Sequence, residues 1–138
     1  MAALDTNVLV RFLVQDDAKQ GLLARALIRS TLEKGEPLSV PVTVMLELEW
    51  VLRSKFGFDK AQIIQTLSSL LATSELSFES ETAVEVALEL FRQNKADFSD
   101  CIHIALSHTA GMTPMWTFDR AASKVDGAKL LSDETERV

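Results

Sequence analysis

Short apolar runs alternate with longer segments of helical periodicity along almost the whole chain. This alternation is typical of parallel sheets whose strands are joined by helices. The predicted strands are Ala2–Leu4, Leu38–Val40, Leu76–Phe78, Met115–Phe118 and Ala128–Leu131. The predicted helices are Asp17–Lys34, Thr43–Lys55, Asp59–Ala72, Glu79–Asn94 and Ser99–Ala110. We therefore expect an α/β fold: a sandwich in which helices flank a mainly parallel central sheet of about five short strands.

Polar and glycine residues mark several helix ends. Thr43 and Asp59 each precede a helical run and are predicted as N-caps, because their side-chain oxygens can accept from free backbone N–H groups. Gly35, Gly57 and Gly111 follow helical runs, where glycine commonly ends a helix.

Length and composition indicate one domain over residues 1–138 and a cytoplasmic protein. The single cysteine, Cys101, excludes an internal disulfide and is predicted to be a buried apolar residue. We expect no membrane span, since no apolar stretch approaches about 20 residues, and no basic leader precedes the first strand. The net charge of −6 argues only weakly against a simple basic nucleic-acid binder and does not exclude an enzyme whose acidic site holds cations.

Four carboxylates occupy positions that favour a common site. Asp5 follows the first predicted strand, Asp119 follows the fourth, Glu47 lies within an apolar helical segment, and Asp100 lies near the start of another. A strand-end aspartate is often only a cap or turn residue. However, ligands of open α/β sheets bind at the carboxyl ends of strands, and carboxylates among apolar neighbours are costly unless paired or metal-bound. Converging carboxylates would suit Mg²⁺ or Mn²⁺, which prefer oxygen ligands.

Two choices stay open from spacing alone. Glu47 and Glu49 fall on opposite flanks of their predicted helix, so at most one of them can face a given site. Asp97 precedes Asp100 by three residues and could share its helical face, or it could form the turn before a helix capped by Ser99.

Other residue types favour a hard cation over competing chemistries. Asn7 and Thr117 supply neutral oxygen atoms near the predicted carboxylates. His103 and His108 are five residues apart on one predicted helix and do not share a face, which disfavours a histidine-based zinc site. The chain has no glycine-rich phosphate loop and no G-x-S-x-G nucleophile elbow.

Four motifs occur in order along the chain: L-D-T-N-V-L-V-R from Leu4, M-L-E-L-E-W-V-L-R from Met45, D-F-S-D-C-I-H-I-A from Asp97 and T-F-D-R-A-A from Thr117. Together they resemble the PIN domain, and within it the VapC-type ribonuclease toxins of bacterial toxin–antitoxin pairs. The resemblance extends from Leu4 to about Leu131.

The resemblance implies a metal-dependent endoribonuclease with a PIN-like α/β/α fold, commonly homodimeric. It also implies inhibition by a small antitoxin whose C-terminal segment wraps the groove. It places the family's acidic site on Asp5, Glu47, Asp100 and Asp119, and so selects Glu47 over Glu49. Asp97 matches a frequent but less essential acid, and Asn7 and Thr117 match positions that orient the site.

The expected mechanism is hydrolysis of an RNA phosphodiester by water. One or two Mg²⁺ or Mn²⁺ ions would lower the pKa of a bound water and neutralise phosphate charge. Asp5, Asp100 and Asp119 are the expected ligands, and Glu47 is either a ligand or positions the water. Because water rather than the RNA 2′-OH attacks, we expect 5′-phosphate and 3′-hydroxyl ends, and 2′,3′-cyclic phosphates would contradict the mechanism.

Two further groups of residues are candidates for binding partners. Leu46 and Trp50 form a second apolar stripe on the Glu47 helix, typical of a dimer or antitoxin interface, or of a helix enclosed within the monomer. Arg11, Arg53 and Arg120 lie beside the acidic motifs and could contact phosphates of a tRNA or ribosomal RNA, although each taken singly is more typical of an ordinary surface charge or a partner of a helix C-terminal dipole.

Two other functions share part of this pattern. A haloacid-dehalogenase-type phosphatase also has an early strand-end aspartate, but it needs a second aspartate where this chain has Asn7. A catalytically inactive PIN-like interaction domain would be expected to lack one or more of the acids, and none is missing.

Overall fold

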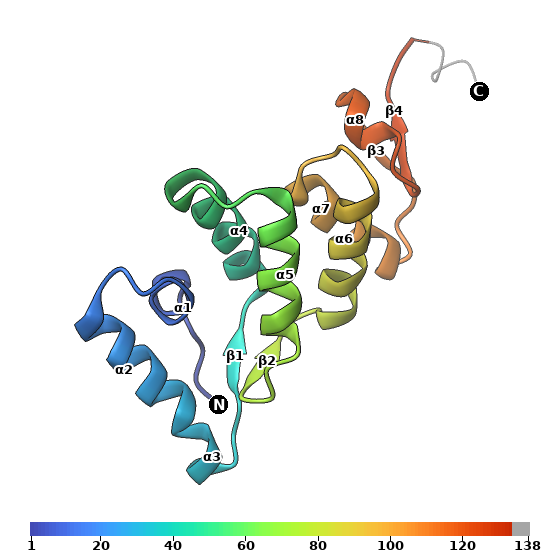
Figure 1. Ribbon diagram of the computed structural model, residues 1–138. Coiled ribbons are helices and arrows are strands. Elements are labelled where there is room, and N and C mark those ends of the chain that lie inside the picture. Colours follow the sequence, from blue (N-terminus) through green and yellow to red (C-terminus); the bar gives the residue numbers. More distant parts are fainter. Residues whose placement is uncertain (134–138) are drawn as a thin grey trace. The chain divides into compact units, whose positions relative to one another are not determined.

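The structure, a computed structural model, describes residues 1–133 and divides into two compact units (Figure 1). The first unit is Met1–Glu81, and the second begins at Thr82. The domain expected from the sequence, residues 1–138, covers both units, and its residues 134–138 lie outside the described part.

The first unit contains a small parallel sheet and five helices. Its elements are α1 (Thr6–Leu13), α2 (Ala18–Arg29), α3 (Thr31–Lys34), β1 (Leu38–Val40), α4 (Val42–Phe56), α5 (Lys60–Leu71) and β2 (Leu76–Phe78). β1 and β2 pair in parallel, with Leu38 opposite Leu76 and Val40 opposite Phe78. α1 packs against both α2 and α4, and α5 packs against β2.

The second unit repeats the combination of helices with a parallel strand pair. Its elements are α6 (Glu81–Gln93), which starts at the unit boundary, α7 (Phe98–Thr109), β3 (Met115–Thr117), α8 (Arg120–Ser123) and β4 (Ala128–Leu130). β3 and β4 pair in parallel, with Trp116 opposite Lys129. Phe91 of α6 and Phe98 of α7 meet edge to face, with ring centroids 5.5 Å apart.

These elements confirm the α/β class, with short parallel strands joined by helices. Four predicted strands are present at or within one residue of their expected bounds. The predicted first strand is reduced to a single parallel bridge between Ala3 and Ser39, with the Leu4 N–H donating to the Ser39 carbonyl at 2.8 Å.

Capping predictions were right where the partner was local. Asp59 caps α5 through a reciprocal pair of hydrogen bonds with Gln62, both 2.8 Å long. Gly35 and Gly57 follow α3 and α4 with φ of 68°, a left-handed conformation in which glycine has no Cβ clash.

Thr43 is not the N-cap of α4. The helix begins at Val42, and the Val42 N–H donates to the Glu79 carboxylate at 2.9 Å, 37 residues away in sequence. This is possible because β1 and β2 end side by side, with the Glu79 N–H donating to the Val40 carbonyl. Glu79 is therefore a capping residue for α4, and α6 begins two residues later, at Glu81, instead of at Glu79.

The remaining differences concern other helices. α1 and α8 were not predicted. The long helix expected over Asp17–Lys34 is divided at Ser30, whose hydroxyl donates to the Leu27 carbonyl. α7 begins at Phe98, so Asp97 rather than Ser99 occupies the N-cap position, without a side-chain cap hydrogen bond.

Each unit has a well-buried apolar interior. Leu9, Met45, Leu48, Leu52 and Ile63 are inaccessible to solvent in the first unit. In the second, Cys101 is fully buried as predicted, on the same helix as the buried Phe98, Ile102 and Ile104. Among residues 1–133, no helix has the length and apolar character needed to cross a bilayer.

Candidate metal centre

Asp5 lies where the Ala3 bridge ends and α1 begins. Its Oδ1 accepts from the Thr6 N–H at 2.7 Å, so Asp5 is the N-cap of α1. The side chains of Asp5 and Asn7 are exposed. One carboxylate oxygen is thus held by the backbone, which fixes the side chain while the second oxygen can accept from or bind another group.

Glu47 and Glu49 have opposite environments on α4. Glu49 is buried, with only 4% of its surface exposed, and its carboxylate accepts from the Arg53 guanidinium at 2.9 Å. Glu47 is exposed. The spacing had left the two open, and the structure shows that Glu49 already pairs with Arg53 while Glu47 faces solvent. Since α1 packs against α4, Asp5 and Glu47 come from adjoining helices of one unit.

Asp97, Asp100 and Asp119 form an acidic group in the second unit. Burial of the Asp100 carboxyl raises its pKa, the negative charges of Asp119 and Asp97 raise it further, and His103 partly offsets them. The structure therefore brings Asp119 and Asp97 close enough for their charges to act on the Asp100 carboxyl. A bound cation would relieve that repulsion.

Asp119 is held in place by its neighbours on both sides. Its backbone N–H donates to the Thr117 hydroxyl at 3.0 Å, and its Oδ1 accepts from the Ala122 N–H at 2.9 Å. Asp119 is thus the N-cap of α8 and lies two residues after the end of β3. Thr117, expected to orient the acidic site, orients the backbone that carries Asp119.

The predicted acids are shared between the two units, with Asp5 and Glu47 in the first and Asp97, Asp100 and Asp119 in the second. Among residues 1–133, no three His, Cys, Asp or Glu side chains lie close enough to hold one metal ion. All of the acids supply oxygen atoms, and the charge crowding at Asp100 favours a positive ligand. The donor set therefore fits a hard divalent cation better than zinc or copper.

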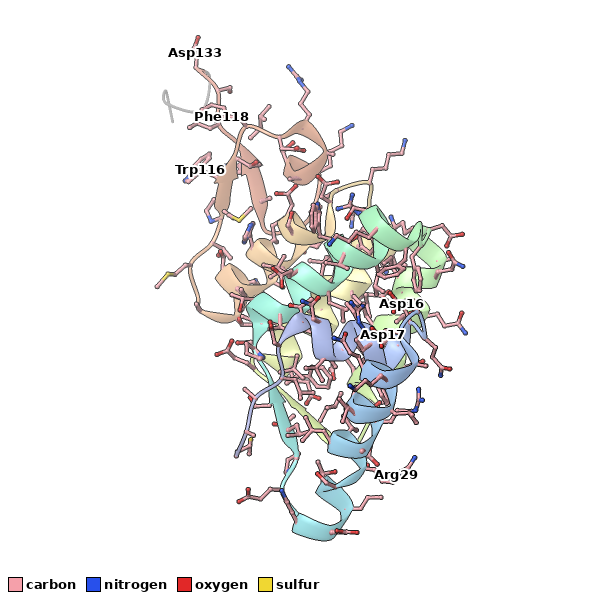
Figure 2. The ribbon with its side chains drawn as sticks, turned by 90° about the vertical axis from the view of Figure 1, so that its left-hand side faces the viewer. Asp16, Asp17, Arg29, Trp116, Phe118 and Asp133 are labelled. Carbon is pink, nitrogen blue, oxygen red and sulfur yellow. The ribbon has the colours of Figure 1, made fainter. Side chains whose placement is uncertain are left out.

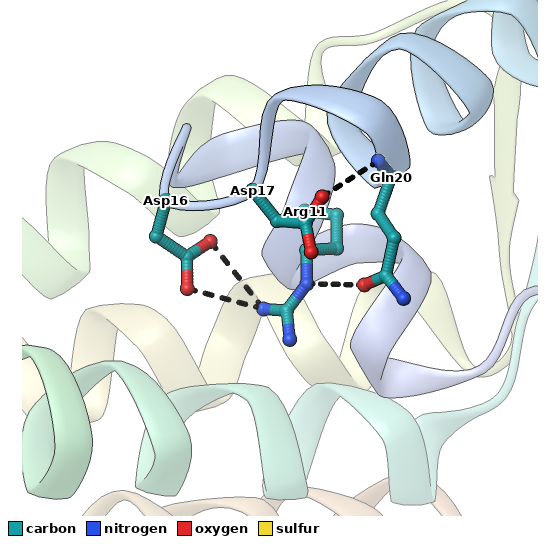
Figure 3. A network of polar contacts seen from close by, with 4 residues as sticks. All are labelled: Arg11, Asp16, Asp17 and Gln20. Carbon is teal, nitrogen blue, oxygen red and sulfur yellow. Dashed lines mark hydrogen bonds and ion pairs between the residues drawn. The ribbon is translucent and has the colours of Figure 1, made fainter.

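Two of the three candidate RNA-binding arginines already have protein partners. Figure 3 shows Arg11 between Asp16 and Gln20: its Nε donates to the Gln20 side chain at 2.6 Å, and its Nη1 lies 3.4 Å from the Asp16 carboxylate. Arg53 pairs with the buried Glu49. Arg120, the first residue of α8, is exposed.

The candidate interface residues of α4 differ in exposure. Trp50 keeps 52% of its surface exposed, whereas Leu46 is half-buried. Both histidines, His103 and His108, are exposed on α7.

Sequence reasoning missed the backbone donors of this site. The Thr6 and Ala122 N–H groups fix Asp5 and Asp119, and both belong to short helices that were not predicted. The available signal was the position of each aspartate just before a run that could be helical, because aspartate is a strong N-cap.

Comparison with known proteins places the chain in one family. The model of the PIN-domain family matches residues 2–128, nearly the whole chain. The chain therefore belongs to the PIN-domain family. One similar protein is the VapC ribonuclease of Aquifex aeolicus (strain VF5), which is 25% identical over 125 residues, covering 91% of this chain and 92% of that protein.

Proposed function

We propose that this protein is a metal-dependent endoribonuclease, the toxin of a toxin–antitoxin pair. The observation that carries the proposal is the acidic group of the second unit, where burial and the charges of Asp119 and Asp97 raise the pKa of Asp100. Family membership and the ribonuclease relative support the same activity. The haloacid-dehalogenase alternative belongs to another family and is set aside.

Asp5, Asp100 and Asp119 would hold Mg²⁺ or Mn²⁺, with Glu47 as a further ligand or as the residue that positions the attacking water. The bound ion would supply Lewis acidity and lower the pKa of a water. Asp5 and Asp119 are oriented by the hydrogen bonds from Thr6 and Ala122. Asn7 and Thr117 are proposed to support this arrangement, and Asp97 to add negative charge.

Hydrolysis then follows from water attack on phosphorus. A P–O bond forms to the water oxygen, the bond to the 3′-oxygen breaks, and the 3′-oxygen takes a proton. The products are a 5′-phosphate and a 3′-hydroxyl. Arg120, and Arg11 or Arg53 where their acidic partners leave them accessible, are proposed to contact substrate phosphates.

The test compares RNA cleavage by the purified wild type with Mg²⁺, with Mn²⁺ and with chelator, and by the Asp5→Asn and Asp119→Asn variants. We expect cleavage only with metal, loss of at least a hundredfold in both variants, and 5′-phosphate ends. Asp133→Asn, an exposed aspartate outside the motifs, is the matched control. Full activity in chelator, or 2′,3′-cyclic phosphate ends, would refute the proposal.

The proposed partners are a cognate antitoxin, a second copy of the chain and an RNA of the tRNA or ribosomal class, in the cytoplasm. The exposed Trp50 and the neighbouring Leu46 are proposed to lie in the dimer or antitoxin interface. Size-exclusion chromatography of Trp50→Glu tests the dimer assignment, with the exposed Glu85→Lys on α6 as control. A dimer that survives Trp50→Glu would place the interface elsewhere.

A further inference from the structure

Two aromatic side chains next to Asp119 are exposed. Phe118 keeps 78% of its surface exposed and Trp116 keeps 48%, whereas the other two aromatic residues of the second unit's described part, Phe91 and Phe98, are buried. Trp116 lies on β3 and Phe118 directly follows it. Figure 2 shows both side chains on the outer side of β3. We call this pair the aromatic edge.

A cation accompanies the aromatic edge. Lys129 of β4 is the register partner of Trp116, and its Nζ lies 5.8 Å from the centre of the indole ring. The Lys129 ammonium is therefore held beside the ring by a cation–π contact. Asp119 follows Phe118 directly, so the two rings and a proposed metal ligand lie within the segment Trp116–Asp119, and the positive charge of Lys129 lies on the neighbouring strand.

We propose that the aromatic edge stacks the bases of single-stranded RNA that enters the cleavage site, with Lys129 facing a phosphate. The inference rests on the proposed ribonuclease activity and adds how its substrate is held. Every base has a π-face, so an aromatic ring can bind an unpaired base regardless of sequence. In a duplex the bases already stack on each other, and the edge is therefore expected to favour loops and single strands.

The tryptophan content of the chain allows base stacking to be followed by fluorescence. The only tryptophans are Trp50 in the first unit and Trp116 in the second, and the chain has no tyrosine. Trp50→Phe leaves Trp116 as the dominant fluorophore, and Trp116→Phe leaves Trp50. A base stacked on an indole ring quenches its emission, whereas a base bound elsewhere does not.

The experiment titrates single-stranded oligouridine, and a duplex of the same length, into both single-tryptophan variants in Mg²⁺. The Asp5→Asn substitution is added to prevent cleavage, and binding is followed in parallel by the anisotropy of labelled RNA. We expect the single strand to quench Trp116 and leave Trp50 unchanged. The duplex is expected to bind at least tenfold more weakly. Saturated binding without Trp116 quenching, or equal quenching by the duplex, overturns the inference.

Variants at Phe118 separate stacking from apolar contact. Phe118→Leu keeps a large apolar side chain and is expected to weaken single-strand binding by about tenfold, as Phe118→Ala does, whereas Phe118→Tyr keeps the affinity. Wild-type affinity in Phe118→Leu would overturn stacking. Cleavage by the chain without Asp5→Asn is measured alongside, so that failure of stacking with intact metal-dependent cleavage leaves the proposed function standing.

Discussion

At the scale of single residues, Asp100 carries the clearest electrostatic signature. Its pKa is raised by burial and by the charges of Asp119 and Asp97. The folded state therefore holds this proton more tightly than the unfolded chain does. The resulting stability is present at low pH and is lost as pH rises through the raised pKa.

We predict that Asp100→Asn raises the melting temperature of the metal-free protein at neutral pH. The gain should shrink as pH falls towards about 4, where the wild-type carboxyl is increasingly protonated. Thermal unfolding in chelator over a range of pH measures this, with Asp133→Asn as the control for a general change in charge. A variant no more stable than wild type at pH 7 would contradict the charge crowding.

A second residue-scale prediction compares two buried threonines. Thr6 is 2% exposed, and its hydroxyl has no hydrogen-bond partner among the described residues. Thr31 is 8% exposed, and its hydroxyl donates to the Ile28 carbonyl at 2.9 Å. A buried hydroxyl without a hydrogen-bond partner lowers the free energy of unfolding, whereas a buried hydroxyl that makes its hydrogen bond raises it.

Thr6→Val is therefore expected to raise the free energy of unfolding by about 1 kcal/mol, and Thr31→Val to lower it by about 1 kcal/mol. Both changes replace a hydroxyl by a methyl group of similar volume, so each is the control for the other. Urea denaturation of the metal-free protein measures the difference. Equal losses in both variants would show that the Thr6 hydroxyl has a partner in solution.

At the scale of elements, the α5 capping box is the best-defined local interaction. Asp59→Ala removes the acceptor for the Gln62 N–H and is expected to lower the free energy of unfolding by about 1 kcal/mol. Asp59→Asn keeps a good N-cap without the charge and should lower the free energy of unfolding by only about a few tenths of a kcal/mol. If Asn destabilises as much as Ala, charge rather than the cap hydrogen bond accounts for the effect.

The same local interactions explain how much of the fold the sequence predicts. Strands such as Leu38–Val40 and Leu76–Phe78, and the Asp59 cap, depend on neighbouring residues and were predicted correctly. The start of α4 was not predicted correctly, because its capping partner, Glu79, lies 37 residues away in sequence.

The helix α1 was missed because its run of Val8, Leu9 and Val10 has the composition of a strand. The Asp5 cap and packing against α2 and α4 make it a helix.

The candidate site shows the same limit. Thr117 and Ala122 hold Asp119 through hydrogen bonds of a local turn. The pKa of Asp100 is raised in part because its helix, α7, brings it close to Asp119 in that turn. Spacing could not choose between Glu47 and Glu49, because the choice depends on which flank of α4 is buried. Glu49 lies on the buried flank and pairs with Arg53, an interaction that the i, i+4 spacing permits but does not require.

At the scale of the whole molecule, the predicted acids belong to two compact units, whereas the sequence predicts one domain. A site made from Asp5, Glu47, Asp100 and Asp119 requires the two units to behave as one folded body. We therefore propose that residues 1–138 unfold as a single cooperative domain, as expected for a chain of this size.

The two tryptophans test this directly, since Trp50 reports on the first unit and Trp116 on the second. In Trp50→Phe and Trp116→Phe, urea unfolding is followed by fluorescence and by far-UV circular dichroism on the same samples. Because each substitution can shift stability by itself, the comparison is made within each variant.

If the chain unfolds as one domain, the urea midpoints measured by fluorescence and by circular dichroism should coincide in both variants. If Trp116 fluorescence changes at a different urea concentration from the dichroism, the second unit unfolds independently.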